Sequence, residues 1–202
     1  MKLAVFPLVV ALSGAVLPGS AHGVTFVDAF APVEQDCADC TFFFFGNFLL
    51  AQTFTVATDG KLEGVILPLS CTGGKLLVAI TDSNAQGPVQ NVLSWTYMDT
   101  AKLAQSPRLT LVRLPRVQVT AGRNLAIVLG NPEGHCGVTW AHTLTFPPVE
   151  GGLQRTDAYP NGHLYWLAAD GNWRPVNNGL SGGPVDDMGF EVLLSSPGSD
   201  EE

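Results

Sequence analysis

Residues 109–129 read Leu-Thr-Leu-Val-Arg-Leu-Pro-Arg-Val-Gln-Val-Thr-Ala-Gly-Arg-Asn-Leu-Ala-Ile-Val-Leu. This stretch contains two apolar segments, Leu109–Val119 and Leu125–Leu129, on either side of Ala121-Gly122. Glycine supplies the positive φ that a tight turn between two strands needs. Because Leu125–Leu129 is apolar on both faces, we predict that it is a central strand.

The same pattern of short apolar runs and turn residues continues along the chain. In Ala51–Val56 polar and apolar residues alternate, which is typical of a half-buried strand. The expected strands are Val24–Phe30, Phe42–Phe48, Ala51–Val56, Leu62–Leu69, Leu76–Thr81, Val92–Tyr97, Leu109–Val119, Leu125–Leu129, Val138–Phe146, Leu164–Ala168 and Met188–Leu194. Only Asp99–Gln105 favours a short helix, with Asp99 as its N-cap. The pattern therefore predicts an all-β protein, an antiparallel β-sandwich or barrel with about ten strands and minimal helix.

Two prolines interrupt the expected strands, and proline cannot donate a hydrogen bond to a sheet. Pro68 and Pro115 should therefore lie at edges or bulges. Four arginines, Arg108, Arg113, Arg116 and Arg123, gather in this region, and we interpret them as balancing charge on an exposed face, with an acidic polysaccharide as the alternative ligand.

The N-terminal stretch has the parts of a secretory signal peptide. Met1 and Lys2 precede a nearly continuous apolar run, Leu3–Leu17, and small residues follow it. A membrane span needs about 20 apolar residues, so cleavage is favoured over a retained anchor. We expect a signal peptide at residues 1–23, one sandwich domain at residues 24–194 and a disordered acidic tail at residues 195–202.

Composition and charge restrict the cellular location and the classes of binding partner that we expect for this protein. The chain has 18 acidic and 10 basic residues, so its net charge of −8 repels phosphate backbones, and we expect no nucleic-acid partner. No later segment is apolar enough to span a membrane once the signal is removed. The mature protein is expected to be secreted, periplasmic or at the cell surface.

Export makes disulfides the expected state of the four cysteines. Cys71 and Cys136 each follow a strongly apolar strand candidate, so we predict a Cys71–Cys136 disulfide, with Cys37–Cys40 closing a local loop. A redox dithiol at Cys37-x-x-Cys40 would normally open a helix, whereas four phenylalanines follow here. A zinc site lacks a second closely spaced ligand pair.

Several segments, taken in order, resemble a family of secreted bacterial jelly-roll domains, the choice-of-anchor R type. The matching segments are Ala51–Val56, Val119–Leu129, Tyr159–Gly162, Asp170–Trp173 and Asp187–Val192. The resemblance implies a lectin-like sandwich in a surface-exposed protein and implies no particular activity. We expect no second module and no sorting signal after residue 194, which is a departure from such architectures.

Aromatic residues concentrate near the C-terminal end, between residues 159 and 174. Sugar rings stack on aromatic planes, and polar neighbours such as His163, Asn172 and Arg174 can bond hydroxyls. The predicted ligand-binding residues are Tyr159, Asn161, Tyr165, Trp166, Asp170 and Trp173. The alternative is that these aromatic residues pack within the core or across a hairpin.

A structural calcium ion is the one cofactor that the sequence suggests. Asp186-Asp187 precedes the last expected strand, where jelly rolls can hold calcium with carboxylates and carbonyls. Solvated turn carboxylates are the alternative interpretation.

A serine hydrolase is a remote alternative function. Gly179-Leu-Ser-Gly-Gly-Pro184 contains the Gly-x-Ser-x-Gly spacing, but no histidine follows Ser181. We therefore expect a non-enzyme, an exported ligand-binding module with carbohydrate as the favoured ligand.

An envelope structural or adhesion protein is the main alternative function. Side chains alternate along a strand, so Phe42–Phe45 cannot all face inward, and two of these rings need a partner or a second covering layer. Self-association, or binding to another envelope protein, is expected there.

Overall fold

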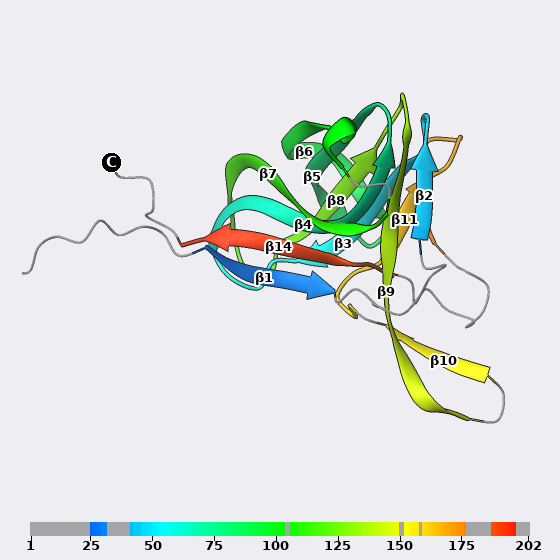
Figure 1. The fold of residues 1–202 in the computed structure, drawn as a ribbon. Coiled ribbons are helices and arrows are strands. Elements are labelled where there is room, and N and C mark those ends of the chain that lie inside the picture. Colours follow the sequence, from blue (N-terminus) through cyan, green and yellow to red (C-terminus); the bar gives the residue numbers. More distant parts are fainter. Residues whose placement is uncertain are drawn as a thin grey trace, which may run out of the picture.

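The computed structural model describes residues 25–31, 41–103, 106–149, 152–157, 159–176 and 187–196 (Figure 1). Within these ranges the chain is almost entirely antiparallel strand, and the helix present is one 3₁₀ turn, η1 (Thr100–Lys102). The strands are β1 (Thr25–Ala31), β2 (Thr41–Phe45), β3 (Leu49–Thr55), β4 (Gly60–Thr72), β5 (Lys75–Asn84), β6 (Gly87–Asp99), β7 (Arg108–Val119), β8 (Asn124–Gly130), β9 (His135–Val149), β10 (Gly152–Asp157), β11 (Leu164–Leu167), β12 (Trp173–Pro175), β13 (Asp187–Met188) and β14 (Phe190–Ser195). The predicted all-β class is confirmed.

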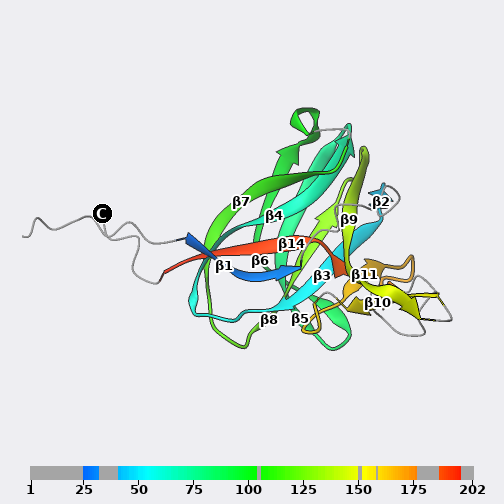
Figure 2. The ribbon, with the colours of Figure 1, turned by 60° about the horizontal axis from the view of Figure 1, so that its bottom comes forward.

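Two sheets pack face to face. One has the order β1-β14-β4-β9-β10, with β7 paired to β4 and with β2 and β13 paired to β9. The other has the order β12-β11-β3-β8-β5-β6. Figure 2 shows β1, β14, β4 and β7 in one layer and β3, β5 and β8 in the other, and Figure 1 shows the β9–β10 hairpin extending away from the body. The predicted sandwich is confirmed.

The core lies between the sheets and depends on alternation along each strand. In β8, Leu125, Ile127 and Leu129 face the other sheet and are fully buried. The smaller Ala126 and Val128 point to the opposite face, where they are buried as well. Burying one large aliphatic side chain stabilises the fold by about 2 kcal/mol. Since β8 is flanked by β3 and β5, the predicted central strand is confirmed.

The outer face of the six-stranded sheet holds a second, smaller core. Ala51, Ala79, Ala126 and Val128 are packed there with Tyr165, and Trp173 covers them in part. The sheet curls so that its two outermost strands, β6 and β12, contact each other. Gly87, with a φ of +110°, allows this approach, since a Cβ there would lie 3.1 Å from the Tyr165 ring and 3.2 Å from Trp173 Cβ.

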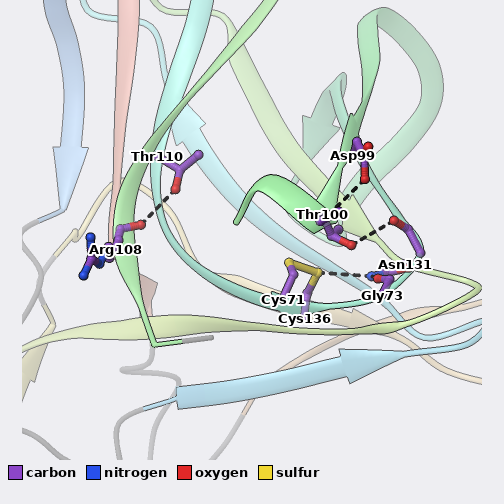
Figure 3. The surroundings of a disulfide bond; sticks show 10 residues. Cys71, Gly73, Asp99, Thr100, Arg108, Thr110, Asn131 and Cys136 are labelled. Atoms are coloured by element: carbon purple, nitrogen blue, oxygen red, sulfur yellow. Dashed lines mark hydrogen bonds between the residues drawn. A yellow bond between two sulfur atoms is a disulfide. The ribbon is translucent and has the colours of Figure 1, made fainter. Parts of the chain in front are cut away.

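The predicted disulfide between Cys71 and Cys136 is confirmed (Figure 3). The two cysteines are register partners on the neighbouring strands β4 and β9, with Cα atoms 4.1 Å apart. Both are buried in the main core. Beside them Asn131 Nδ2 donates to the carbonyl of Gly73 at 3.0 Å and lies 3.3 Å from Cys136 Sγ. The disulfide therefore joins two strands that already pair in one sheet.

The observed strands differ from the expected ones in their bounds, and two of these differences change where a strand or the tail is placed. The predicted strand Phe42–Phe48 is too long, because β2 ends at Phe45 and the chain turns at Gly46, whose φ is +57°. Ser195, expected in the tail, is the last residue of β14 and pairs with Thr25 and Lys61. β10 and β12 were not expected. Asp99 caps η1 as predicted, accepting a hydrogen bond from Ala101 N at 3.0 Å.

The two prolines have different outcomes. Pro115 lies on the edge strand β7, within the register shift opposite Glu63, as expected. Pro68 lies inside the sheet, which the sequence did not predict. Its strand β4 pairs with β14 as far as Ile66 and with β9 from Leu69, so Pro68 falls where one neighbour replaces the other. That position does not need its missing N–H.

Some expected features lie outside the described residues. These are the signal peptide at residues 1–23, the Cys37–Cys40 pair, Ser181, Asp186 and residues 197–202 of the expected tail. In the described ranges, no helix combines the length and the apolar character that a membrane crossing requires.

Candidate functional site

A pocket of about 370 Å³ opens at the outer face of the six-stranded sheet. One wall is the tip of the β5–β6 hairpin, and the other is the loop before β11. Its floor is formed by β3 and the start of β8. The lining residues are Thr53, Phe54, Ser83, Asn84, Ala85, Asn124, Pro160, Asn161, Gly162, His163 and Tyr165.

Hydrogen bonds between His163 and Thr53 fix the loop wall to β3. His163 N donates to Thr53 Oγ1 at 2.8 Å, and Thr53 N donates to the carbonyl of His163 at 3.0 Å. Gly162 lies so close to this strand that a Cβ would meet the Thr53 carbonyl oxygen at 1.9 Å. Only glycine fits between the loop and β3, so the pocket wall depends on Gly162.

Tyr159 anchors the beginning of the same loop. Its hydroxyl donates to the carbonyl of Thr55 at 3.3 Å and accepts from Thr55 N at 3.1 Å. Its ring packs edge-on against Phe190, with centroids 5.2 Å apart. Burial raises the pKa of Tyr159 above 10.0, the Thr55 backbone hydrogen bond lowers it in part, and the charges of Asp28 and Asp187 raise it further. The side chain therefore positions the loop and does not line the pocket.

A buried polar bridge holds this loop to both sheets. Asp187 Oδ1 accepts from Gln52 Nε2 at 2.7 Å, and Asp187 Oδ2 accepts from Tyr159 N at 3.0 Å. Gln52 Oε1 in turn accepts from Met188 N at 2.9 Å. Gln52 and Asp187 are both almost wholly buried. Hydrogen bonds from protein donors to both carboxylate oxygens offset part of the free-energy cost of burying Asp187.

The calcium prediction at Asp186 and Asp187 remains untested. Asp186 lies outside the described residues, and both oxygens of Asp187 accept hydrogen bonds from protein donors. Among the residues that the structure describes, no three His, Cys, Asp or Glu side chains are grouped as metal ligands.

The hairpin wall is held by its own turn. Ser83 Oγ donates to the carbonyl of Leu125 at 3.1 Å, and Asn84 Oδ1 accepts from Gln86 N at 2.8 Å. On the floor, Asn124 Oδ1 accepts from Thr55 Oγ1 at 2.8 Å. Asn84 and Asn124 keep their amide NH₂ groups as donors. Both walls of the pocket are thus set by hydrogen bonds within the protein.

The polar lining consists of amides, hydroxyls and two aromatic rings, one of them the imidazole of His163. The rings of His163 and Tyr165 lie 6.5 Å apart in an edge-on arrangement. Burial raises the pKa of Tyr165 above 10.0, so its phenol stays protonated. None of the described lining residues is Asp, Glu, Lys or Arg. Such a surface suits an uncharged ligand that both donates and accepts hydrogen bonds.

The six predicted ligand-binding residues divide into two groups. Asn161 and Tyr165 line the pocket. Trp173 packs beside Tyr165 in the second core. Trp166 points to the other side of β11, where it stacks on Phe48 with centroids 5.7 Å apart. Tyr159, as described above, supports the loop.

Asp170 lies apart from the pocket, in the exposed turn between β11 and β12. It accepts from Asn172 N at 3.1 Å and pairs with Arg174 at 2.8 Å. The Asn172 backbone hydrogen bond, followed by the Arg174 and Asn172 side chains, lowers the pKa of Asp170 below 3.8. The Arg174 guanidinium also lies 5.8 Å from the centroid of the Trp166 ring.

Four polar lining residues were not predicted: Thr53, Ser83, Asn84 and Asn124. They come from three strands, and Ser83 is about 80 residues from Asn161 along the chain. A turn such as Asn84–Gly87 has the same composition whether or not it borders a pocket. Register alone places Asn124 opposite Thr55 and beside the loop.

Neither the models of known protein families nor the curated proteins contain a match to this chain.

Proposed function

We propose that this protein is a non-catalytic, extracytoplasmic binding module that takes a neutral carbohydrate in the pocket between the β5–β6 hairpin and the loop before β11. The observation that carries the proposal is the uncharged polar lining beside an aromatic edge. Sugar hydroxyls donate and accept hydrogen bonds, and the apolar C–H faces of sugar rings pack against aromatic rings. The pocket offers polar groups for the hydroxyls and an aromatic ring for the C–H faces.

The positions of the donors favour recognition. The amides of Asn84, Asn124 and Asn161 come from three separate segments and converge on one hollow. The carbonyl and hydroxyl groups that hold the walls are already bonded within the protein, so little ordering is needed when a ligand enters.

The chemistry of the lining favours binding over hydrolysis. Most glycosidases use a pair of carboxylates, and nucleophilic hydrolases use an activated serine or cysteine oriented by a base. The described lining offers the imidazole of His163 and the hydroxyl of Ser83 on opposite walls. The Ser83 hydroxyl donates to a backbone carbonyl, which orients its proton away from a base.

The disulfide supports a location outside the cytoplasm. A buried Cys71–Cys136 bond is typical of proteins that fold in oxidising compartments. Together with the expected signal peptide and the resemblance to choice-of-anchor R domains, it favours a secreted, periplasmic or surface-exposed module.

A structural or adhesive role is the second candidate. The exposed side chains of Phe43 and Phe45, at 61% and 55%, alternate with the buried Phe44, as expected for a strand with one open apolar face. Such a strand can attach to another envelope protein. If this role is the correct one, Phe43→Ser with Phe45→Ser abolishes attachment to cell envelopes while glycan binding is absent.

The test of the carbohydrate proposal uses a variant that fills the pocket. Ala85 is exposed at its rim, so Ala85→Trp blocks entry without removing any hydrogen bond. Ala101→Trp, on an exposed position near the opposite end of β5, is the matched control. A glycan array finds the ligand, and calorimetry with that glycan should show binding by the wild type and the control but not by Ala85→Trp. Equal binding by all three proteins would exclude this pocket.

A further inference from the structure

The outer face of the eight-stranded sheet carries an apolar patch across β7, β4, β14 and β1. One row across these strands consists of Leu111, Ile66, Glu191 and Phe30. A second row on the same face, two residues further along β7, consists of Arg113, Gly64, Leu193 and Val27. Between them runs a row of buried core residues, Val112, Val65, Val192 and Ala29. The alternation shows that the first two rows face away from the core.

Several large apolar side chains on this face are exposed to solvent. Leu109, next to Leu111 on this face of β7, is 63% exposed, and Phe30 is 54% exposed. Val27 and Leu111 are 49% and 43% exposed. Taking about 200 Å² for each fully exposed large side chain, these four present roughly 400 Å² of apolar surface. A stable interface takes about 800 Å² from each partner, and the half-buried Ile66 and Leu193 lie within the same area.

Two charges of opposite sign lie within the patch. Arg113 is on β7 opposite Gly64, and Glu191 is on β14 opposite Ile66, so the two flank β4. In the part of the chain that the structure describes, neither side chain has an ion-pair or hydrogen-bond partner, although Arg116 on the same strand pairs with Glu63 at 2.8 Å. An unpaired cation and an unpaired anion in one apolar area form a self-complementary surface.

A second copy of the chain fits this arrangement better than a lipid surface does. Two copies facing each other about a two-fold axis between Arg113 and Glu191 bring each arginine opposite the glutamate of the other copy. An anionic bilayer would repel Glu191 and is disfavoured by the net charge of −8.

We infer that two copies of this chain form a closed two-fold dimer through the outer face of β7, β4, β14 and β1. The apolar side chains are covered in the dimer, and Arg113 pairs with Glu191 across the interface twice. The pocket lies on the opposite sheet of each copy, so the inference does not depend on the proposed function.

The test is a charge swap measured by sedimentation equilibrium. The wild type should dimerise with a Kd at or below the order of 100 μM, the range expected of a modest interface. Arg113→Glu and Glu191→Arg each place like charges opposite one another and should weaken the dimer at least about tenfold. The double variant restores opposite charges, so it should recover most of the wild-type affinity.

Two further variants locate the interface. Leu109→Ser with Leu111→Ser should give a folded monomer, as judged by an unchanged circular dichroism spectrum. Phe43→Ser with Phe45→Ser, on the separate strand β2, should leave the dimer intact. A monomeric wild type, a double charge variant weaker than both single variants, or a dimer lost only in the β2 variant would each overturn the inference.

Discussion

Replacing both Cys71 and Cys136 with alanine should cost this protein a large part of its stability. The disulfide joins residues 65 positions apart in the sequence. In the chain-entropy model, closing a loop of that length lowers the conformational entropy of the unfolded chain, which is equivalent to a stabilisation of about 4 kcal/mol. In the folded state the two strands remain neighbours, since β4 and β9 also pair through Leu69–Val138 and Ser70–Gly137. The loss therefore arises mainly in the unfolded chain.

Urea unfolding followed by tryptophan fluorescence measures this loss. The free energy of unfolding should fall by about 4 kcal/mol. The melting temperature should fall by roughly 8 to 16 °C for a chain of this size. The m-value should rise, because the unfolded chain without the bridge exposes more surface. The fully reduced wild type, which keeps both sulfur atoms, is the control for packing. A loss below about 1 kcal/mol with an unchanged m-value would refute the entropic reasoning.

Three further predictions concern the frame of the pocket. Gln52→Ala should lower the free energy of unfolding by about 2 to 3 kcal/mol in urea titrations, because it removes the buried hydrogen bonds of Gln52 with Asp187 Oδ1 and with Met188 N. Gly162→Ala forces a Cβ against the carbonyl of Thr53 and should cost about 1 to 3 kcal/mol and weaken glycan binding, both measurable on one preparation. Because the folded state raises the pKa of Tyr159, the phenol stabilises the fold fully below pH 10.0, and this contribution is lost as pH rises through the raised pKa. Unfolding titrations from pH 8 to pH 11 should therefore show a shallower alkaline loss for Tyr159→Phe than for the wild type; identical slopes would contradict it.

The sequence predicted the parts of the fold that depend on local pattern. Leu125–Leu129 was recognisable as a central strand because both of its faces are apolar, and β8 has a neighbour on each side. The pairing of Cys71 with Cys136 was predictable because each follows an apolar run, Leu62–Leu69 or Leu125–Leu129. In contrast, the phenylalanine run concealed the turn at Gly46, since aromatic periodicity gave no sign that the chain reverses there.

The candidate site was predicted only in part. Asn161 and Tyr165 line the pocket, while Trp166 belongs to the opposite side of the same strand because neighbouring residues on a strand point in opposite directions. Ser83 and Asn84 could not be found, because their position opposite the loop depends on the curl of the whole sheet. Pattern along the chain identifies a strand, but not which distant turn faces it.

The place of β14 in its sheet restricts when this molecule can fold. β14 lies between β1 and β4 and pairs with both, so the ladder joins these two strands only after residues 190–195 have emerged from the ribosome. A nascent chain that lacks these residues cannot close the larger layer. The larger sheet is therefore completed late in synthesis, after most of the chain has left the ribosome.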